Sequence, residues 1–301
     1  MLDDEEVAVI GNGSMGIALA HAVATAGHRT VVRCPDAMTA DVVGDAALVI
    51  VAVPSTQFRE TARGLGALGV FGKALLSSTK GFEPDTYLRM SEILAQETGA
   101  AAVGAIAGAN ITPEIVAGEL TAIVVASHDS EVRALAKRCL ESRQLRVGLD
   151  EDLLSIELTA ALKNVVAVGV GIAAGLGLGF NARSIVFACG LREITILGAA
   201  LGAEPGIFAG SAGAGDLFLT ASSPDSLNRR LGVELGRGAR LADIVGELPE
   251  VPEGIGSIRA CRALARSHDF YLPIAEAVAA ILEGERDATA LEAACRETPF
   301  A

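Results

Sequence analysis

Short apolar runs recur along the first half of the chain, and helical stretches separate them. Six of these runs have the length and residue types of strands: residues 7–10, 30–33, 47–53, 74–78, 103–107 and 121–126. After the first run, apolar residues return at close to helical spacing over about residues 14–26. Strands that alternate with helices predict a doubly wound, mostly parallel sheet that is covered on both faces.

The pattern changes near residue 150. The stretches that follow are apolar and lack strand alternation, and they predict helices at residues 153–174, 184–201, 226–236, 254–267 and 273–283. A chain of 301 residues is also long enough for two domains. We therefore predict an α/β domain over residues 1–150 and an all-α domain over residues 151–301.

Charge and cysteine content narrow the classes of protein. A formal net charge of -13 argues against a nucleic-acid partner, which requires a basic face. The five cysteines are scattered without metal-ligand spacing, so we expect reduced thiols, no metal site and a cytoplasmic protein. The most apolar run, residues 165–180, is shorter than the roughly 20 residues that span a bilayer. We expect it to form a buried helix, with no membrane partner.

A glycine-rich segment joins the first predicted strand to the first predicted helix. It reads GNGSMG over residues 11–16 and fits the G-x-G-x-x-G pattern of Rossmann dinucleotide-binding domains. In that role Gly11 allows the tight turn, Gly13 lets the backbone approach a pyrophosphate, and Gly16 lets the helix pack on the strand. The alternative is a plain glycine-rich turn. Cofactor contacts are predicted for Gly11, Gly13, Ser14, Met15 and Gly16.

The residue at the end of the second strand helps to select the cofactor. An acidic residue there would accept hydrogen bonds from a ribose 2′-hydroxyl, whereas arginine favours a 2′-phosphate. The chain has Arg33 at this point, which favours NADP. Asp36 keeps NAD open, and a solvated surface arginine is the alternative interpretation.

Lys163 is the leading candidate for a proton donor, which hydride transfer to a carbonyl requires. It lies in ELTAALKNVVAVGVG, a stretch with almost no other charge. A buried ammonium needs a partner or a substrate, and desolvation lowers the pKa of such a group. Glu157 lies six positions earlier, off the same helical face, so it is not an obvious partner. The alternative is a lysine that reaches solvent from the end of the helix.

Polar residues also follow two predicted strands. Lys80 comes after one strand end and Asn110, in the segment that starts at Gly108, comes after another. Ligand sites in parallel sheets lie at these carboxyl ends, so both residues are well placed to contact a substrate. An ordinary loop lysine and a turn asparagine are the alternatives.

Two segments of the helical half carry further candidates. Asp216 enters a helix from a glycine-rich turn, where it could orient the Lys163 ammonium, cap the helix, or do both. Thr220 lies one turn further on. The segment SLNRR, residues 226–230, supplies hydrogen-bond donors suited to an anion.

At these residues the chain resembles the NAD(P)-dependent glycerol-3-phosphate dehydrogenase family, over nearly its whole length. The motifs are GNGSMG (11–16), VAVPS (51–55), STKG (within 77–81), GANITPE (108–114), ELTAALKNVVAVGVGIAAGLGLGFN (157–181), GAGDL (213–217) and SLNRR (226–230). ALKN together with GDL is specific to the family, whereas many dehydrogenases share the glycine-rich loop.

The resemblance implies reversible hydride transfer between a nicotinamide cofactor and C2 of glycerol 3-phosphate or dihydroxyacetone phosphate. It also implies a Rossmann domain followed by a helical substrate domain. The catalytic residues it implies are Lys163, Lys80, Asp216 and Thr220. The substrate contacts it implies are Lys80, Gly108, Asn110, Ser226 and Asn228. Further cofactor contacts are implied for Pro54, Thr112 and Glu253.

Three departures from the family bear on the substrate more than on the chemistry. The family has a phosphate-clamping arginine where this chain has Leu227, which supplies neither charge nor paired hydrogen bonds. Residues 33–47 form a shorter segment than usual, so the helix there should be reduced or lost. Phe180 stands where the family commonly has aspartate.

Two other functions stay open. The first is a paralogous dehydrogenase that acts on a different small 2-oxo or hydroxy substrate, which Leu227 would favour. The second is a non-catalytic dinucleotide-binding sensor, although the joint presence of Lys163, Lys80 and Asp216 argues against it. A homodimer formed through the apolar helical half is compatible with the composition.

Overall fold

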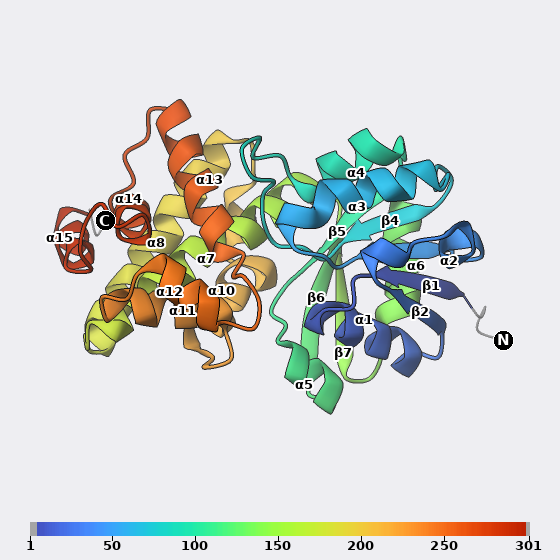
Figure 1. The fold of residues 1–301 in the computed structure, drawn as a ribbon, viewed down its shortest axis with the longest axis horizontal. Coiled ribbons are helices and arrows are strands. Elements are labelled where there is room, and N and C mark those ends of the chain that lie inside the picture. The colour runs from blue at the N-terminus through green and yellow to red at the C-terminus, as the bar shows by residue number, and fades with distance from the viewer. Residues whose placement is uncertain (1–4, 299–301) are drawn as a thin grey trace. The chain divides into compact units, whose positions relative to one another are not determined.

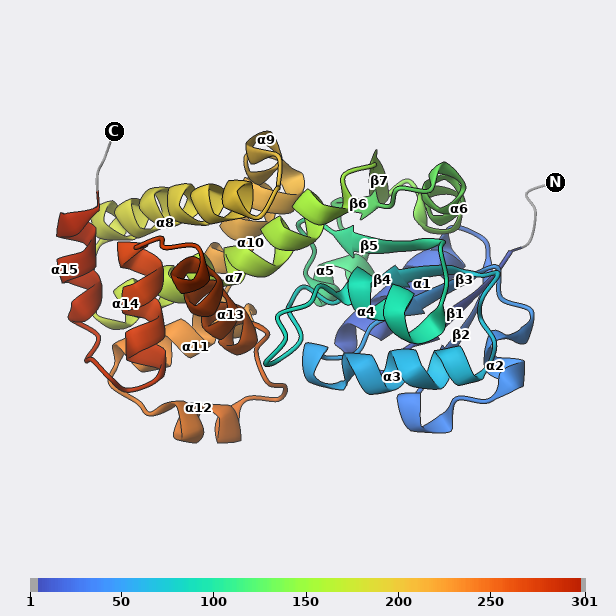
Figure 2. The same cartoon turned by 90° about the horizontal axis from the view of Figure 1, so that it is seen from above.

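A computed structural model describes residues 5–298, without the side chains of residues 41 and 42. The described chain divides into two compact units, one that ends at Glu157 and one that begins at Leu158. Figures 1 and 2 show the strands gathered in the N-terminal unit, whereas the C-terminal unit is built of helices. The predicted fold class is confirmed.

Seven strands in the described residues form one sheet, in the order β2-β1-β3-β4-β5-β6-β7. Within it, strands pair in parallel except for the antiparallel pair β5 and β6. The strands are β1 (Glu6–Ile10), β2 (Arg29–Arg33), β3 (Leu48–Val51), β4 (Ala74–Ser77), β5 (Val103–Ala107), β6 (Thr121–Ala126) and β7 (Leu145–Asp150). The six predicted strands are all present.

Strand β7 is the element of the sheet that the sequence pattern did not predict. Leu145 and Val147 are buried, whereas Arg146 and Gly148 between them are exposed. Only two core residues therefore mark the strand, too few for a clear alternation. The strand pairs with β6 at the edge of the sheet, where its outer side chains need not be apolar.

Alternate residues of the strands contribute to two hydrophobic cores. On one face, Val7 and Val9 pack in a core with residues of α1, α5 and α6. On the other face, Ala8 and Ile10 pack in a core with residues of α3 and α4. These helices are α1 (Ser14–Thr25), α3 (Ser55–Ala67), α4 (Met90–Thr98), α5 (Thr112–Ala117) and α6 (Ser130–Leu140). With both faces covered, the ends of the strands remain for ligands.

The segment between β2 and β3 holds only short elements. A single 3-10 turn, η1, spans Pro35–Ala37, and helix α2 spans Ala40–Gly44. The nearby Lys73 ammonium donates to the carbonyls of Gly44 and Ala46, both at 2.7 Å, and so caps the end of α2. The expectation of a reduced helix here is confirmed.

The C-terminal unit contains helices and no strand among its described residues, and its first helix begins a few residues before the boundary at Leu158. Its helices are α7 (Leu153–Gly175), α8 (Phe180–Ala200), α9 (Pro205–Phe208), the π-helical turn η2 (Ser211–Gly215), α10 (Asp216–Ser222), α11 (Leu227–Gly236), α12 (Leu241–Glu247), α13 (Gly254–Ser267), α14 (Pro273–Leu282) and α15 (Ala290–Glu297). Helix α7 is long and apolar enough to cross a membrane, but 94% of its most apolar window is buried inside the protein.

The apolar run predicted as one buried helix at residues 165–180 is interrupted. Helix α7 ends at Gly175, and α8 begins at Phe180. Gly177 lies between them with φ +77°, a left-handed conformation that glycine adopts without strain. The buried helix therefore ends at Gly175, within one residue of the end predicted at residue 174, and the rest of the apolar run forms the turn into α8.

Helices α7 and α11 touch through glycines. A Cβ on Gly171 would lie 2.5 Å from the Arg229 carbonyl oxygen, and one on Gly232 would lie 2.2 Å from the Val168 carbonyl oxygen. Gly175 and Gly236 repeat this contact one turn along. Backbones can approach this closely only without side chains between them. The crossing brings the start of α11 beside α7.

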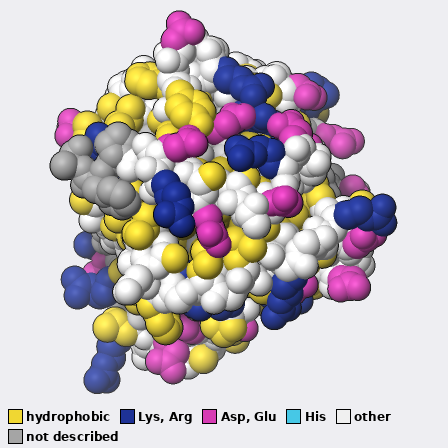
Figure 3. All heavy atoms as spheres, turned by 90° about the vertical axis from the view of Figure 1, so that its left-hand side faces the viewer, with side chains coloured by type: hydrophobic (Ala, Val, Ile, Leu, Met, Phe, Trp, Pro, Cys, Tyr) yellow, Lys and Arg dark blue, Asp and Glu magenta, His cyan; other side chains and the backbone are white. Residues whose placement is uncertain are grey.

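The surface around α14 and α15 mixes side chains of both charges with hydrophobic ones (Figure 3). Arg262 of α13 pairs with Glu276 at 2.7 Å and with Glu285 at 2.6 Å. Arg266 joins Glu276 at 3.1 Å. The charges of Arg262 and Arg266 are thus compensated by neighbouring carboxylates.

Candidate active site

The glycine-rich turn of the N-terminal unit has no room for side chains at two of its glycines. Gly11 has φ +124°, and a Cβ there would lie 2.2 Å from the Ala52 carbonyl oxygen. A Cβ on Gly16 would lie 1.9 Å from the Gly11 carbonyl oxygen. Gly13 is the exposed N-cap of α1, and Ser14 opens that helix. The turn therefore presents exposed backbone at a helix N-terminus, which suits a phosphate group.

The four other predicted cofactor contacts near this turn differ in burial and in charge. Met15 is half-buried and packs against the core below α1. Arg33, at the end of β2, is exposed, and its carbonyl oxygen accepts the Gly11 N–H at 2.8 Å. Pro54 is the exposed N-cap of α3, and Thr112 is the first residue of α5. Only Arg33 among these four brings a charge next to the turn.

Lys80, Gly108 and Asn110 come together at the ends of β4 and β5. The Lys80 ammonium donates to the Gly108 carbonyl oxygen at 2.8 Å and to Asn110 Oδ1 at 3.1 Å. Gly108 has φ +104°, so it permits the sharp turn that aims its carbonyl at the lysine. The two strands are parallel neighbours, which is why residues 28 or 30 positions apart meet.

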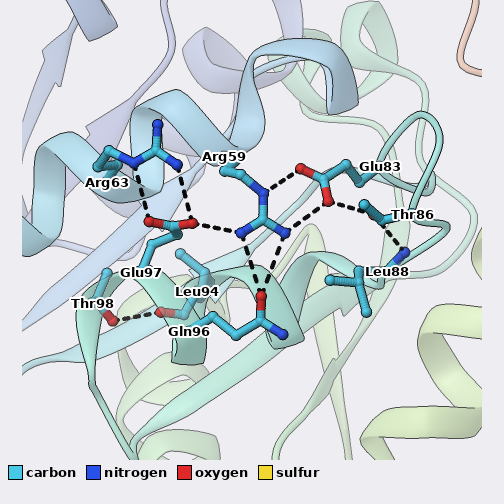
Figure 4. Close-up of polar contacts among 9 residues, drawn as sticks. All are labelled: Arg59, Arg63, Glu83, Thr86, Leu88, Leu94, Gln96, Glu97 and Thr98. Atoms are coloured by element: carbon cyan, nitrogen blue, oxygen red, sulfur yellow. Dashed lines mark hydrogen bonds and ion pairs between the residues drawn. The ribbon is translucent and has the colours of Figure 1, made fainter.

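The loop that follows Lys80 is held by a charged network (Figure 4). Arg59 of α3 donates to both carboxylate oxygens of Glu83 and, at 2.5 Å, to Glu97 of α4. Thr86 donates its hydroxyl to Glu83 as well. The Arg59 guanidinium holds the pKa of Glu83 below its usual value. The backbone next to Lys80 is thereby tied to two helices.

Lys163 lies in the C-terminal unit and is buried with two polar partners. Its ammonium is 3.1 Å from Asp216 Oδ1 and 2.5 Å from Thr220 Oγ1. The exposed fractions are 4% for Lys163, 1% for Asp216 and 8% for Thr220. Burying an ammonium is costly unless an opposite charge and hydrogen bonds compensate it, and here both do. The lysine does not reach solvent from a helix end.

Asp216 owes its position to an unusual local backbone. The π-helical turn η2 precedes it, and a Cβ on Gly213 would lie 2.1 Å from the Phe208 carbonyl oxygen. Thr220 donates to the Asp216 carbonyl oxygen at 2.7 Å, as a threonine one helical turn later can. Single π turns occur often at functional sites because they redirect side chains.

A second network starts at the residue after the lysine. Asn228 donates from Nδ2 to Asn164 Oδ1 at 3.0 Å, and its own Oδ1 accepts the Gly254 N–H at 2.9 Å. Asn164 donates to Ser257 Oγ at 3.4 Å. Asn228 thus joins α7 to the N-terminus of α13, where Glu253 is the N-cap. Its amide makes contacts within the protein on both sides.

The start of α11 contains the remaining candidates. Ser226 is the N-cap of this helix, and its hydroxyl accepts the Arg229 N–H at 3.2 Å. Leu227 and Arg229 are half-buried, whereas Arg230 is exposed. Two arginines therefore follow the leucine within its first turn.

Among the described residues, no three His, Cys, Asp or Glu side chains gather as a metal site would require.

Sequence reasoning did not single out Asn164 or Ser257. Asn164 is buried at 1% exposure in the same apolar stretch as Lys163, so the rule that identified the lysine applies to it as well. Glu157, which appeared unsuited to the lysine, pairs within the N-terminal unit. It accepts hydrogen bonds from Arg89 at 2.7 Å and from the Ser91 N–H at 2.9 Å.

Comparisons with known proteins agree over both units. The family model for the NAD-dependent glycerol-3-phosphate dehydrogenase N-terminus matches residues 31–133, and the one for the C-terminus matches residues 152–292. A glycerol-3-phosphate dehydrogenase [NAD(P)+] of Ectopseudomonas mendocina is 36% identical over 99% of this chain and 96% of its own. That of Azotobacter vinelandii is 36% identical over 97% and 95%.

A solved structure shows the same arrangement of elements. The crystal structure of glycerol-3-phosphate dehydrogenase from Coxiella burnetii superposes with a TM-score of 0.91. Its sequence is 26% identical, and the match covers 98% of each chain. With full-length relatives above 30% identity, the chain belongs to the NAD-dependent glycerol-3-phosphate dehydrogenase family.

Proposed function

We propose that this protein is an NAD(P)-dependent oxidoreductase that interconverts dihydroxyacetone phosphate and glycerol 3-phosphate. The observation that carries the proposal is the buried Lys163 ammonium, held by Asp216 and Thr220. An ammonium so placed, inside an apolar helix, has a use as a proton donor to a carbonyl oxygen. The relatives, which bear that activity in their names, support the same reaction.

The glycine-rich turn fits the cofactor. Side chains at Gly11 and Gly16 would clash with the backbone of Ala52 and Gly11, so these glycines permit the tight turn into α1. The first N–H groups of α1 would then meet the charge of a pyrophosphate. Exposed Arg33 suits a 2′-phosphate, which favours NADP over NAD. When bound, the nicotinamide supplies or accepts the hydride at C2.

The protein's own residues have separate tasks in reduction. The Lys163 ammonium gives a proton to the C2 oxygen as the carbonyl becomes an alcohol, and Asp216 and Thr220 hold the amine in place. Lys80 and Asn110, which hydrogen-bond to each other, are further candidates for substrate contacts. Ser226 and Asn228, at the start of α11, are candidates for further substrate contacts. Asn228 also accepts a hydrogen bond from the Gly254 N–H and so positions that backbone. A cytoplasmic location and a homodimer stay predictions.

One observation favours a second substrate class. Leu227, at the first position of α11, offers no charge to a phosphate. An enzyme with the same lysine and cofactor but another small 2-oxo substrate would fit this residue. Arg229 and Arg230 follow Leu227 closely in the sequence and supply positive charge. We therefore favour the phosphorylated substrate.

The test is a panel of ketones offered to the purified protein with NADPH and, separately, with NADH. We expect dihydroxyacetone phosphate to give the highest kcat/KM, and NADPH to be used better than NADH. Absorbance at 340 nm reports both. Unphosphorylated dihydroxyacetone serves as the matched control substrate. Faster turnover of an unphosphorylated 2-oxo compound would support the second class, and no oxidation of either cofactor would contradict both.

A further inference from the structure

One buried hydroxyl near the lysine lacks a hydrogen-bond partner. Thr159 of α7 is fully buried, at 0% exposure, and its Oγ1 bonds to no atom of the protein. Most buried polar groups in proteins are paired, because an unpaired one forfeits its hydrogen bonds to water. An exception calls for an explanation, such as a ligand that arrives later.

Other helical threonines of this chain behave differently. Five of them donate to the carbonyl oxygen four residues earlier in the helix: Thr25, Thr61, Thr98, Thr195 and Thr220. That bond is the usual way in which a helix satisfies a threonine hydroxyl. Thr159 also lies in a regular helix, yet its hydroxyl does not make this bond.

Position connects this hydroxyl with the proposed chemistry. Thr159 precedes Lys163 by four residues, so both side chains leave the same face of α7, with Cβ atoms roughly 5–6 Å apart. The proposed function assigns the ammonium of Lys163 to the C2 oxygen of the substrate. Side chains that leave one helix face can meet two oxygens on neighbouring carbons of one small ligand.

The surroundings limit what that second oxygen can be. Ile156 and Leu162, which flank Thr159 along α7, are buried at 2% and 0% exposure. A phosphate dianion would be costly in such a place, whereas a neutral hydroxyl requires only one partner that can donate or accept. Threonine supplies such a partner.

We propose that Thr159 is a further substrate-binding residue, whose hydroxyl pairs with the hydroxyl on the carbon next to the reacting carbonyl. The inference rests on the proposed function and names one contact of that site. It makes Thr159 a specificity residue that selects hydroxylated ketones over ketones with a methyl group at the same carbon.

Thr159→Val tests the contact, because valine keeps the shape and removes the hydroxyl. Thr159→Ser keeps the hydroxyl and is the matched control. Each is assayed with NADPH on dihydroxyacetone phosphate and on the phosphorylated methyl ketone that lacks the C1 hydroxyl. We expect the valine variant to lose about tenfold in kcat/KM on the hydroxylated substrate and to be unchanged on the analogue. The serine variant should retain most of the wild-type selectivity.

Urea unfolding of the same variants separates a binding role from a structural one. Removing an unpaired buried hydroxyl should leave the free energy of unfolding unchanged or higher. A fall in stability would instead identify a hydroxyl that holds a buried water molecule, and would overturn the proposal. Equal losses on both substrates, or no loss on either, would overturn it as well. Turnover of dihydroxyacetone phosphate by the wild-type protein tests the proposed function. The comparison of the Thr159 variants tests the Thr159 contact, so each proposal has its own measurement.

Discussion

At the scale of single residues, the sequence predicted a site residue where a charged side chain occurs in an apolar stretch. An ammonium in an apolar stretch needs compensation, and this requirement singled out Lys163. The structure places Asp216 and Thr220 against it, from 53 and 57 residues away. The sequence pattern does not single out Thr159, because a helical threonine usually donates to its own backbone, and only the three-dimensional structure shows that this one does not.

Leu227 leads to a prediction at the same scale. Leu227→Arg adds a guanidinium at the start of α11, where Ser226 and Asn228 already lie. We expect the KM for dihydroxyacetone phosphate to fall about tenfold, since charge-assisted hydrogen bonds to a phosphate are strong. Steady-state kinetics measure this, with Leu227→Met as the uncharged control of similar volume. If the arginine brings no gain and an unphosphorylated ketone is turned over well, the second substrate class is favoured.

At the scale of elements, the hydrophobic pattern was sufficient wherever a strand or helix has a full apolar face. Strands made almost wholly of apolar residues, such as β3 (LVIV) and β6 (TAIVVA), were predicted, whereas β7 carries only two buried core residues and was not. Neither the antiparallel pairing of β5 with β6 nor the glycine contact of α7 with α11 follows from periodicity. Both depend on which elements meet, and local sequence does not encode that directly.

The loop after Lys80 gives an element-scale prediction. Its carboxylate Glu83 has a pKa lowered from 4.5 by the Arg59 guanidinium, so its contribution to stability is present above pH 4.5 and is lost as the pH falls through the lowered pKa. Glu83→Gln should therefore reduce the free energy of unfolding by about 1–3 kcal/mol at pH 7. The difference in the free energy of unfolding between Glu83→Gln and wild type should become smaller towards pH 3.

Urea unfolding at several pH values measures this gap. The exposed Glu119 offers a control, because Glu119→Gln should leave stability nearly unchanged at every pH. A gap for Glu83→Gln that stays constant down to pH 3 would show that the Arg59 ion pair does not stabilise the loop.

At the scale of the whole molecule, the candidate residues are divided between the two units. The N-terminal unit contains the glycine-rich turn and the group Lys80, Gly108 and Asn110. The C-terminal unit contains Lys163 with its partners. The change of hydrophobic period near residue 150 predicted a boundary between an α/β part and a helical part, and the described chain divides after Glu157. Which ketone the enzyme prefers depends on a few side chains such as Leu227, and periodicity carries no information about those.

The most direct test of the account is the effect of Lys163→Ala on turnover and on cofactor binding, measured side by side. Loss of the proton donor should lower kcat for dihydroxyacetone phosphate by at least about 10²-fold. The dissociation constant for NADPH should change little, because the glycine-rich turn lies in the other unit. Lys137→Ala, which removes a surface lysine of α6, should leave both unchanged. A Lys163→Ala protein that binds NADPH and still turns over at the wild-type rate would contradict the account.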